Sequence, residues 1–278
     1  VFYFGGYIER GRECGASSYA YTLPDPETLD ALIVFPHNIS PYSPESVFQT
    51  ILTRCKDLPI YSFFGDLPST FSVIANEDPA IKELARHIAE THAYRKVSIL
   101  SGPDSPESLS RYRRDRIVEL LGERGITVAP ESIADGDFTM ESGRQAARKL
   151  LSDGQTIPDV LVCLNDEMAI GAAREFLNKG ISVPEDIAIT GFDDVEEGSS
   201  LAARLSSVSF PIWEMTAALL DRVASDLSGT TTYESEKIRF NASFVIRESC
   251  GCTSRMAQAH ATLQSTESRE PQPIKAQW

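Results

Sequence analysis

Residues 158–192, PDVLVCLNDEMAIGAAREFLNKGISVPEDIAITGF, decide the fold. Two short apolar runs, 158–165 and 186–192, flank a longer segment, 166–180, that has the residue spacing of a helix. Strands that are apolar on both faces are typical of parallel sheets covered by helices on each side. The stretch therefore predicts a strand–helix–strand unit with parallel strands.

The same alternation continues upstream of this unit. Further apolar runs of strand length occur at 30–36, 58–65 and 96–103, with longer segments of helical spacing between them. Repeated strand–helix alternation predicts an α/β fold with doubly wound parallel sheets flanked by helices.

The helical segments carry recognisable features. Residues 166–180 begin with acidic side chains and end at Lys179-Gly180, as the helix dipole and a left-handed cap both prefer. Residues 139–154 begin at Thr139 and end at Gly154, a second expected glycine cap. Residues 78–92 place their apolar side chains on one stripe.

The alternation breaks twice, at a Pro/Ser-rich stretch after Gly102 and at SSVSFP after Leu205. Two breaks indicate two lobes joined by more than one crossover, with a cleft between them. We expect an N-terminal lobe, incomplete at its start, that contains residues 1–103 and 210–236. The expected C-terminal lobe contains residues 104–209 and 237–252, and residues 253–278 are expected to be a tail or linker.

The charge balance bears on partners and location. A formal net charge of −14 should repel the phosphate backbone of nucleic acids. No apolar run approaches the roughly 20 residues that span a bilayer, and the first residues lack the order of a secretory signal. We expect a cytoplasmic protein without membrane contact, although the start at Val1 leaves a lost signal peptide or upstream domain open.

Common catalytic motifs are absent: there is no nucleophile elbow, phosphate loop, zinc-protease motif or dinucleotide fingerprint. The four histidines, His37, His87, His92 and His260, lie apart in the sequence, and no nucleophile–base pair can be named. We therefore expect neither an enzyme nor a bound cofactor.

The five cysteines are an odd number and are scattered, except for Cys250 and Cys252. This is not the pattern of a disulfide framework. A zinc site needs about four ligands, and no second Cys or His pair lies at a suitable spacing, so we expect no metal.

The stretch ITGFDDV, 189–195, places two adjacent carboxylates directly after a predicted strand. Side chains of consecutive residues diverge, so Asp193 and Asp194 cannot both reach one substrate atom as an acid–base pair. The carboxyl ends of strands in open α/β sheets are where ligands bind. We expect Asp193 to contact a ligand and Asp194 to make a turn or hinge bond. In the preceding Asn165-Asp166 pair, we expect Asp166 to cap the following helix and Asn165 to face outward.

Residues 162–223 resemble the ligand-binding core of lactose-repressor (LacI) type transcriptional regulators. They contain, in that family's order, Asn-Asp before Met-Ala-Ile-Gly, then Val-Pro-Glu-Asp, Gly-Phe-Asp-Asp, and a serine-rich strand leading to a Pro-initiated helix. Upstream segments and FVIRESCGC extend the resemblance to about residues 28–252.

The resemblance implies a type I periplasmic binding protein fold: two Rossmann-like lobes, hinged by crossovers, that close on a sugar, nucleoside or related metabolite. It also implies a homodimer that meets DNA only through a segment absent from this chain. Carried over position by position, the ligand-binding residues are Arg111, Phe138, Asn165, Asp193 and Asn76.

Three departures from the family pattern bear on the site. Asn76-Glu77 stands where the family has Asp-Asn, and Arg114-Asp115 replaces a Gly-Phe pair, which places extra charge beside the cleft. At the front, VFYFGG resembles the family's second strand, and no helix-turn-helix is present. We therefore expect a partial chain that lacks the first strand.

Several functions compete. The first is the ligand-sensing part of a LacI-type regulator that signals by lobe closure. The second is a sensor domain of a diguanylate cyclase or histidine kinase, which RESCGC followed by a polar segment resembles. A transporter's solute receptor is the third, and an enzyme is the least supported.

Overall fold

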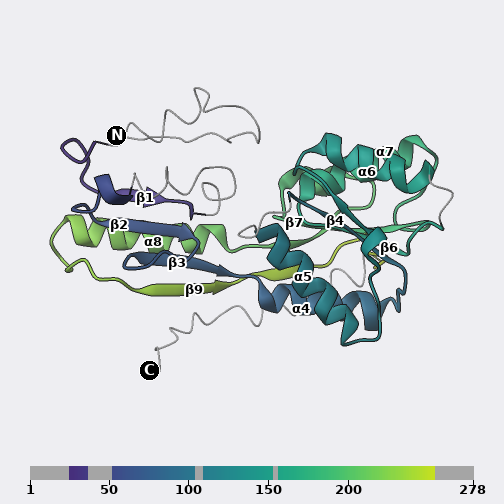
Figure 1. Ribbon diagram of the computed structural model, residues 1–278, viewed down its shortest axis with the longest axis horizontal. Helices are drawn as coiled ribbons and strands as arrows, with labels where there is room; N and C mark the ends of the chain where they lie inside the picture. The colour runs from purple at the N-terminus through teal and green to yellow at the C-terminus, as the bar shows by residue number, and fades with distance from the viewer. Residues whose placement is uncertain (1–24, 37–51, 104–108, 153–155, 254–278) are drawn as a thin grey trace. The chain divides into compact units, whose positions relative to one another are not determined.

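The computed structural model describes residues 25–36, 52–103, 109–152 and 156–253 (Figure 1). The sequence expectations for the first strand and for the tail lie outside these residues. The described chain forms two compact units. Of the described residues, those from 25 to Asn76 and Pro211–Phe240 belong to unit 1, and those in Glu77–Phe210 and 241–253 belong to unit 2.

The described residues of unit 1 form a four-stranded sheet with a long helix against it (Figure 1). Strands β1 and β2 pair in parallel, as do β2 and β3. Helix α8 buries Met215 and Leu219 against the aromatic side chains of this sheet. The elements in sheet order are β1 (Leu32–Val34), β2 (Ile60–Phe64), β3 (Phe71–Asn76) and β9 (Lys237–Asn241), with α8 spanning Ile212–Leu227.

Unit 2 contains a six-stranded sheet in the order β10-β8-β7-β6-β4-β5. All neighbours pair in parallel except β10, which runs antiparallel to β8 at the edge. The strands are β4 (Val97–Ser101), β5 (Ile133–Asp135), β6 (Val160–Cys163), β7 (Ala188–Phe192), β8 (Ser206–Ser209) and β10 (Ser243–Val245). From β4 the chain goes outward to β5 and then returns to β6 on the other side. The predicted doubly wound α/β fold is confirmed, with its topological switch point between β4 and β6.

The helices of unit 2 follow the predicted segments closely. Helix α7 ends where Gly180 adopts φ +76°, the left-handed cap that its sequence predicted. The predicted helix 78–92 changes to π-helical geometry at His87. The helices are α4 (Asp78–Arg86), the π-helix His87–Thr91, α5 (Leu109–Gly122), α6 (Met140–Ser152) and α7 (Asp166–Asn178), with 3₁₀ turns at Pro130–Ser132 and Glu196–Ser200. None of the helices formed by described residues combines the length and apolar character needed to cross a membrane.

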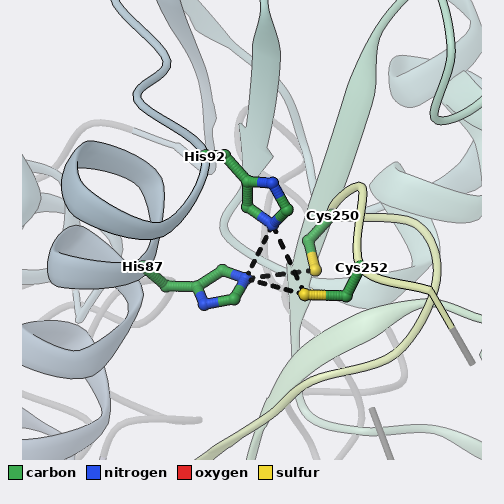
Figure 2. A group of neighbouring side chains, drawn as sticks. All are labelled: His87, His92, Cys250 and Cys252. Atoms are coloured by element: carbon green, nitrogen blue, oxygen red, sulfur yellow. Dashed lines mark hydrogen bonds between the residues drawn. The ribbon is translucent and has the colours of Figure 1, made fainter. Parts of the chain in front are cut away.

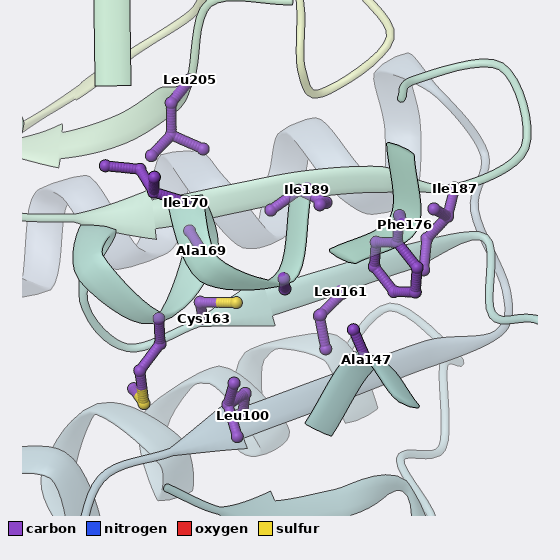
Figure 3. Packing of buried hydrophobic residues seen from close by; sticks show 12 residues of the cluster. Leu100, Ala147, Leu161, Cys163, Ala169, Ile170, Phe176, Ile187, Ile189 and Leu205 are labelled. Carbon is purple, nitrogen blue, oxygen red and sulfur yellow. The ribbon is translucent and has the colours of Figure 1, made fainter. Parts of the chain in front are cut away.

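The core of unit 2 lies between the central strands and helices α6 and α7 (Figure 3). Phe176 of α7 packs with Leu161 of β6, with Ile187, which precedes β7, and with Ile189 of β7, and all four side chains are buried. Burying a side chain of this size stabilises the fold by roughly 1.5–3 kcal/mol. This core fixes the strand ends from which the candidate site is built.

The change from one unit to the other comes earlier than the sequence predicted. Residues 77–103, expected in the N-terminal lobe, lie in unit 2, because β4 pairs with β5 and β6 and α4 packs on α5. Residues 237–240 lie in unit 1, because β9 is a neighbour of β3. The chain changes unit at Asn76–Glu77, directly between a strand and a helix, so no Gly/Pro-rich break marks the position.

Helices α6 and α7 approach each other through two glycines. A Cβ at Gly143 of α6 would lie 2.1 Å from the carbonyl oxygen of Met168, and one at Gly171 of α7 would lie 2.0 Å from that of Met140. The neighbours at both positions are backbone atoms, which cannot turn aside.

Gly171→Ala should therefore lower the free energy of unfolding by about 1–3 kcal/mol, because the two helices must move apart. Urea unfolding followed by circular dichroism measures this. Gly122→Ala is the control, since a Cβ at Gly122 of α5 would meet nothing within 4 Å. It should leave the stability unchanged or raise it by up to about 1 kcal/mol. Equal losses in both variants would contradict the close helix contact.

Candidate functional site

Four of the five predicted ligand residues lie at the carboxyl edge of the unit 2 sheet. Phe138 follows β5, Asn165 follows β6, and Asp193 follows β7. Arg111 lies in the first turn of α5, the helix after β4, and is half-buried. Because these strands are parallel, their carboxyl ends share one edge, next to the switch point where open α/β sheets bind ligands. Asn76, the fifth residue, ends β3 in unit 1.

Phe138 and Asn165 are in direct contact. The Asn165 side-chain Nδ2 donates a hydrogen bond to the Phe138 carbonyl oxygen at 2.9 Å. The Phe138 ring lies over Gly102, where an added Cβ would come within 2.1 Å of the ring. Phe138 has φ +67°, a left-handed conformation that costs a non-glycine residue about 1–3 kcal/mol. The surroundings therefore hold the Phe138 backbone in this strained conformation, with the ring against Gly102.

The two adjacent carboxylates after β7 point to different partners. Asp193 has φ +100° and Asp194 φ +55°, so both backbones are left-handed. The Asp194 carboxylate forms an ion pair with Arg247 at 2.6 Å, and its N–H donates to the Ser207 hydroxyl. The Asp193 N–H donates to the Val208 carbonyl, but no hydrogen bond reaches the Asp193 carboxylate from the described residues. Asp194 thus makes the structural bond that was expected, and Asp193 keeps its carboxylate available.

Asp193 is accessible despite its crowded surroundings. Desolvation by the surrounding protein raises the pKa of Asp193, and the charge of Arg113 opposes this rise. Solvent nonetheless reaches the side chain, which is exposed. The desolvation is therefore incomplete, and a ligand in solution can reach the carboxylate.

Neither Asn165 nor Asp166 has the role predicted for it, and both residues are buried. Asn165 has extended backbone angles and is the N-cap of α7, where its Oδ1 accepts from the Met168 N–H at 3.0 Å. The prediction that Asp166 caps the helix is wrong, because Asp166 is already helical and points toward the neighbouring strands. Its carboxylate accepts from the Ser207 hydroxyl at 2.7 Å and from the Val195 N–H at 2.8 Å. The buried Asp166 thereby fixes the loop that carries Asp193.

Asp166 also makes this loop sensitive to pH. Burial raises its pKa from the ordinary 3.8 to about 7, against the two hydrogen bonds that lower it. Between about pH 4 and 7 the folded chain holds a proton that the unfolded chain has released. This group therefore lowers the free energy of unfolding as pH rises, by up to about 1.4 kcal/mol per pH unit.

Asp166→Asn removes this titration. The free energy of unfolding of the variant minus that of the unaltered chain should rise between pH 4 and 7. Urea unfolding of both chains at a series of pH values measures this difference. A difference that stays constant over that range would show that Asp166 does not titrate in the folded chain.

Sequence reasoning missed the most connected side chain of this edge, Arg113. Its guanidinium forms two hydrogen bonds with the Glu77 carboxylate, at 2.6 and 2.7 Å, and donates to the Leu164 carbonyl at 3.2 Å. It also lies over the rings of Phe192 and Phe210, with Cζ 4.8 and 5.7 Å from the ring centroids. Arg113 and Glu77 are both buried.

A sequence signal for Arg113 exists. Arg113 shares one helical stripe with Ile117, Leu120 and Leu121, which are all buried. The spacing alone therefore places an arginine on the inner face of α5. The charge of Glu77, one of the family departures, is neutralised by Arg113, and Arg114 pairs with Asp115 at 2.9 Å.

Arg113→Met should destabilise the chain by about 3–5 kcal/mol, because it leaves the Glu77 carboxylate buried without its countercharge. Thermal and urea unfolding measure the loss. Arg144→Met is the matched control, since the side chains of Arg144 and its partner Glu141 are 45% and 48% exposed, and it should change stability by no more than about 1 kcal/mol. Similar losses in both variants would contradict the special role of Arg113.

The sequence profile of one family, the periplasmic binding protein-like domain, matches residues 85–250. The chain belongs to this family. Its relatives make it a ligand-binding domain of the LacI type, as the sequence resemblance implied.

Two curated relatives and one solved structure illustrate the similarity of this periplasmic binding protein-like domain. The probable HTH-type transcriptional repressor ExuR of Bacillus subtilis is 29% identical over 198 residues, which cover 70% of this chain and 58% of ExuR. The HTH-type transcriptional regulator AscG of Escherichia coli is 32% identical over 152 residues, covering 52% and 44%. The chain thus spans about half the length of these relatives. A sugar-binding transcriptional regulator (LacI family) from Escherichia coli, solved with phosphate, is 27% identical with a TM-score of 0.64, covering 79% of this chain and 76% of that chain. These relatives are named as regulators and not as enzymes.

A second group of polar side chains in this periplasmic binding protein-like domain lies at the opposite edge of the sheet. His87 and His92 meet Cys250 and Cys252, and their ligand atoms all lie within 4.8 Å of one another (Figure 2). The expectation of no metal assumed that Cys250 and Cys252 have no partner pair. The fold supplies that pair, because the π-helix brings two histidines five residues apart onto one side.

Proposed function

We propose that this chain is the effector-sensing domain of a LacI-type transcriptional regulator, with a sugar or a related polyhydroxy metabolite as effector. The proposed signal is the closure of two lobes that the family resemblance implies, in which the effector favours one conformation by its differential affinity. The relatives named above, one of them a sugar-binding regulator, support this reading.

One observation carries the proposal: of three neighbouring carboxylates at the sheet edge, Asp193 alone keeps its oxygens for a ligand. Asp166 accepts from Ser207 and Val195, and Asp194 pairs with Arg247. Asp193 is exposed, and the described residues donate no hydrogen bond to its carboxylate. Two of the three carboxylates thus have partners within the chain, and the third lies at the carboxyl end of β7.

The chemistry of the edge suits an uncharged ring with several hydroxyls. A carboxylate accepts hydrogen bonds from two hydroxyl groups, and these charge-assisted bonds are the stronger kind. The half-buried Phe138 ring offers an apolar surface for a sugar ring, and Arg111 offers donors for ring or hydroxyl oxygens. The Asn165 side chain caps α7 with its Oδ1 and bonds to the Phe138 carbonyl with its Nδ2. Its proposed part is to position Phe138 and also to contact the ligand.

The proposal does not include catalysis. Asp193 and Asp194 diverge, and Asp166 is buried under the loop, so these acids do not form a pair aimed at one substrate atom. A binding role needs only the one accessible carboxylate.

Asp193→Asn tests the site. A thermal-shift screen of sugars, polyols and nucleosides first identifies a ligand, and calorimetry then measures its affinity for both chains. We expect the variant to bind at least about tenfold more weakly, since one charge-assisted hydrogen bond is worth about 1.5–3 kcal/mol. Its melting temperature without ligand should stay within a few degrees of the unaltered chain.

Glu196→Gln is the matched control, because Glu196 is an exposed carboxylate three residues further on. It should bind the same ligand with unchanged affinity. Unchanged affinity in Asp193→Asn, or equal losses in both variants, would overturn the assignment of Asp193.

For the whole protein, the proposal extends to a cytoplasmic homodimer that meets DNA through a segment outside these 278 residues. The net charge of −14 supports that separation, because the chain itself should repel a phosphate backbone. A sensor attached to a different output domain would use the same ligand site, so the calorimetry tests the sensing role whichever output is present.

A further inference from the structure

The group formed by His87, His92, Cys250 and Cys252 joins two segments that are far apart in the sequence. His87 begins the π-helix that extends α4, and His92 is its C-cap. Cys250 and Cys252 lie in the turn that follows β10 (Figure 2). In Figure 2 both imidazole rings direct a nitrogen toward the two sulfur atoms.

The separations between these atoms match the geometry of a tetrahedral metal. A zinc ion binds nitrogen at about 2.0–2.1 Å and sulfur at about 2.3 Å, which places its ligand atoms roughly 3.3–3.8 Å apart. The two Nε2 atoms lie 3.1 Å apart, three of the four sulfur–nitrogen separations are 3.3, 3.4 and 3.5 Å, and all ligand atoms lie within 4.8 Å of one another. An ion could therefore enter with shifts of only a few tenths of an ångström.

We propose that these four side chains bind one Zn²⁺ ion in a closed structural site. Two imidazole nitrogens and two thiolates in tetrahedral arrangement are a donor set that selects zinc among the common metals. All four positions are filled by protein side chains, which leaves no open position for a substrate or water. The site is therefore structural and not catalytic.

The surroundings hold the four ligands in place. Gly251, between the cysteines, has φ +99°, and a Cβ there would lie 2.5 Å from the Tyr94 hydroxyl. That hydroxyl donates to the Cys250 carbonyl at 3.1 Å, and the Tyr94 ring stacks on His92 at 5.0 Å. A glycine is thus required in Cys-Gly-Cys, and Tyr94 braces one ligand from each segment.

Burial argues against an accidental surface cluster. His87, Cys250 and Cys252 are buried, and His92 is half-buried. Metal binding releases the thiol protons, and a divalent cation supplies the positive charge that favours both thiolates.

The position of the site indicates what the metal does. Ser249, next to Cys250, bonds to the amino ends of β7 and β8, through the Ile189 N–H and carbonyl and the Ser206 N–H. The zinc site therefore lies at the sheet edge opposite Asp193. It ties the π-helix after α4 to the turn that follows β10. The proposed metal therefore fixes the amino edge of the sheet and not the ligand edge.

Metal analysis of the chain tests the proposal. The protein, purified without chelators and dialysed with Zn²⁺, should retain about one zinc per chain by plasma mass spectrometry. Cys252→Ser and His92→Ala should retain far less. Cys55→Ser is the matched control, since Cys55 is a buried free cysteine of unit 1, and it should keep the full content.

A second measurement uses the unaltered chain, so that a variant that fails to fold cannot decide the outcome. After reduction and removal of metal, Co²⁺ should give the intense visible bands of a tetrahedral ion together with thiolate charge-transfer absorption. Zn²⁺ should then displace these bands and raise the melting temperature. A chain that retains no zinc, or that gives only the weak spectrum of hydrated Co²⁺, would overturn the proposal. So would a chain that is purified with a Cys250–Cys252 disulfide and binds no metal after that disulfide is reduced.

Discussion

The buried contact between Arg113 and Glu77 organises the edge of the sheet on which the proposed function depends. Through it, the start of α4, the inner face of α5 and the ends of β6, β7 and β8 share one guanidinium. A buried ion pair gives little net stability, because desolvation offsets most of its attraction. Its effect here is positional: two forked hydrogen bonds and two aromatic faces allow few arrangements of the strand ends.

A division of roles among neighbouring acids follows from that arrangement. Phe192, which packs under Arg113, directly precedes Asp193, so the residue that carries the free carboxylate leaves a fixed strand end. The Asp166 carboxylate accepts a hydrogen bond from the Val195 N–H in the following loop, and Arg247 forms an ion pair with Asp194. The left-handed backbone at Asp193 and Asp194 is strained, and these contacts maintain it. At the other edge of the same sheet, the His/Cys group joins the π-helix after α4 to the turn that follows β10.

The fold was largely predictable because its signals are local. Apolar runs and helical spacing gave β1, β2, β4, β6 and β7 and the helices between them, and Gly180 marked the end of α7. The short β5, with no fully buried residue, gave no such signal. The unit boundary at Asn76–Glu77 was missed because no turn residues mark it. At the site, strand-end position pointed to Asp193, but which of Asn165 and Asp166 caps α7 depends on the extended backbone angles of Asn165. The His/Cys group needed the tertiary fold, since its halves lie far apart in sequence.

The central claim is that Asp193, held at the end of β7, is the acid that meets the ligand. A crystal structure of the chain with the ligand found by screening tests it most directly. The account predicts ligand hydroxyls within about 3 Å of the Asp193 carboxylate, with Asp166 and Asp194 still bonded to Val195 and Arg247. A ligand bound away from the carboxyl ends of β5, β6 and β7, with Asp193 facing solvent, would contradict it.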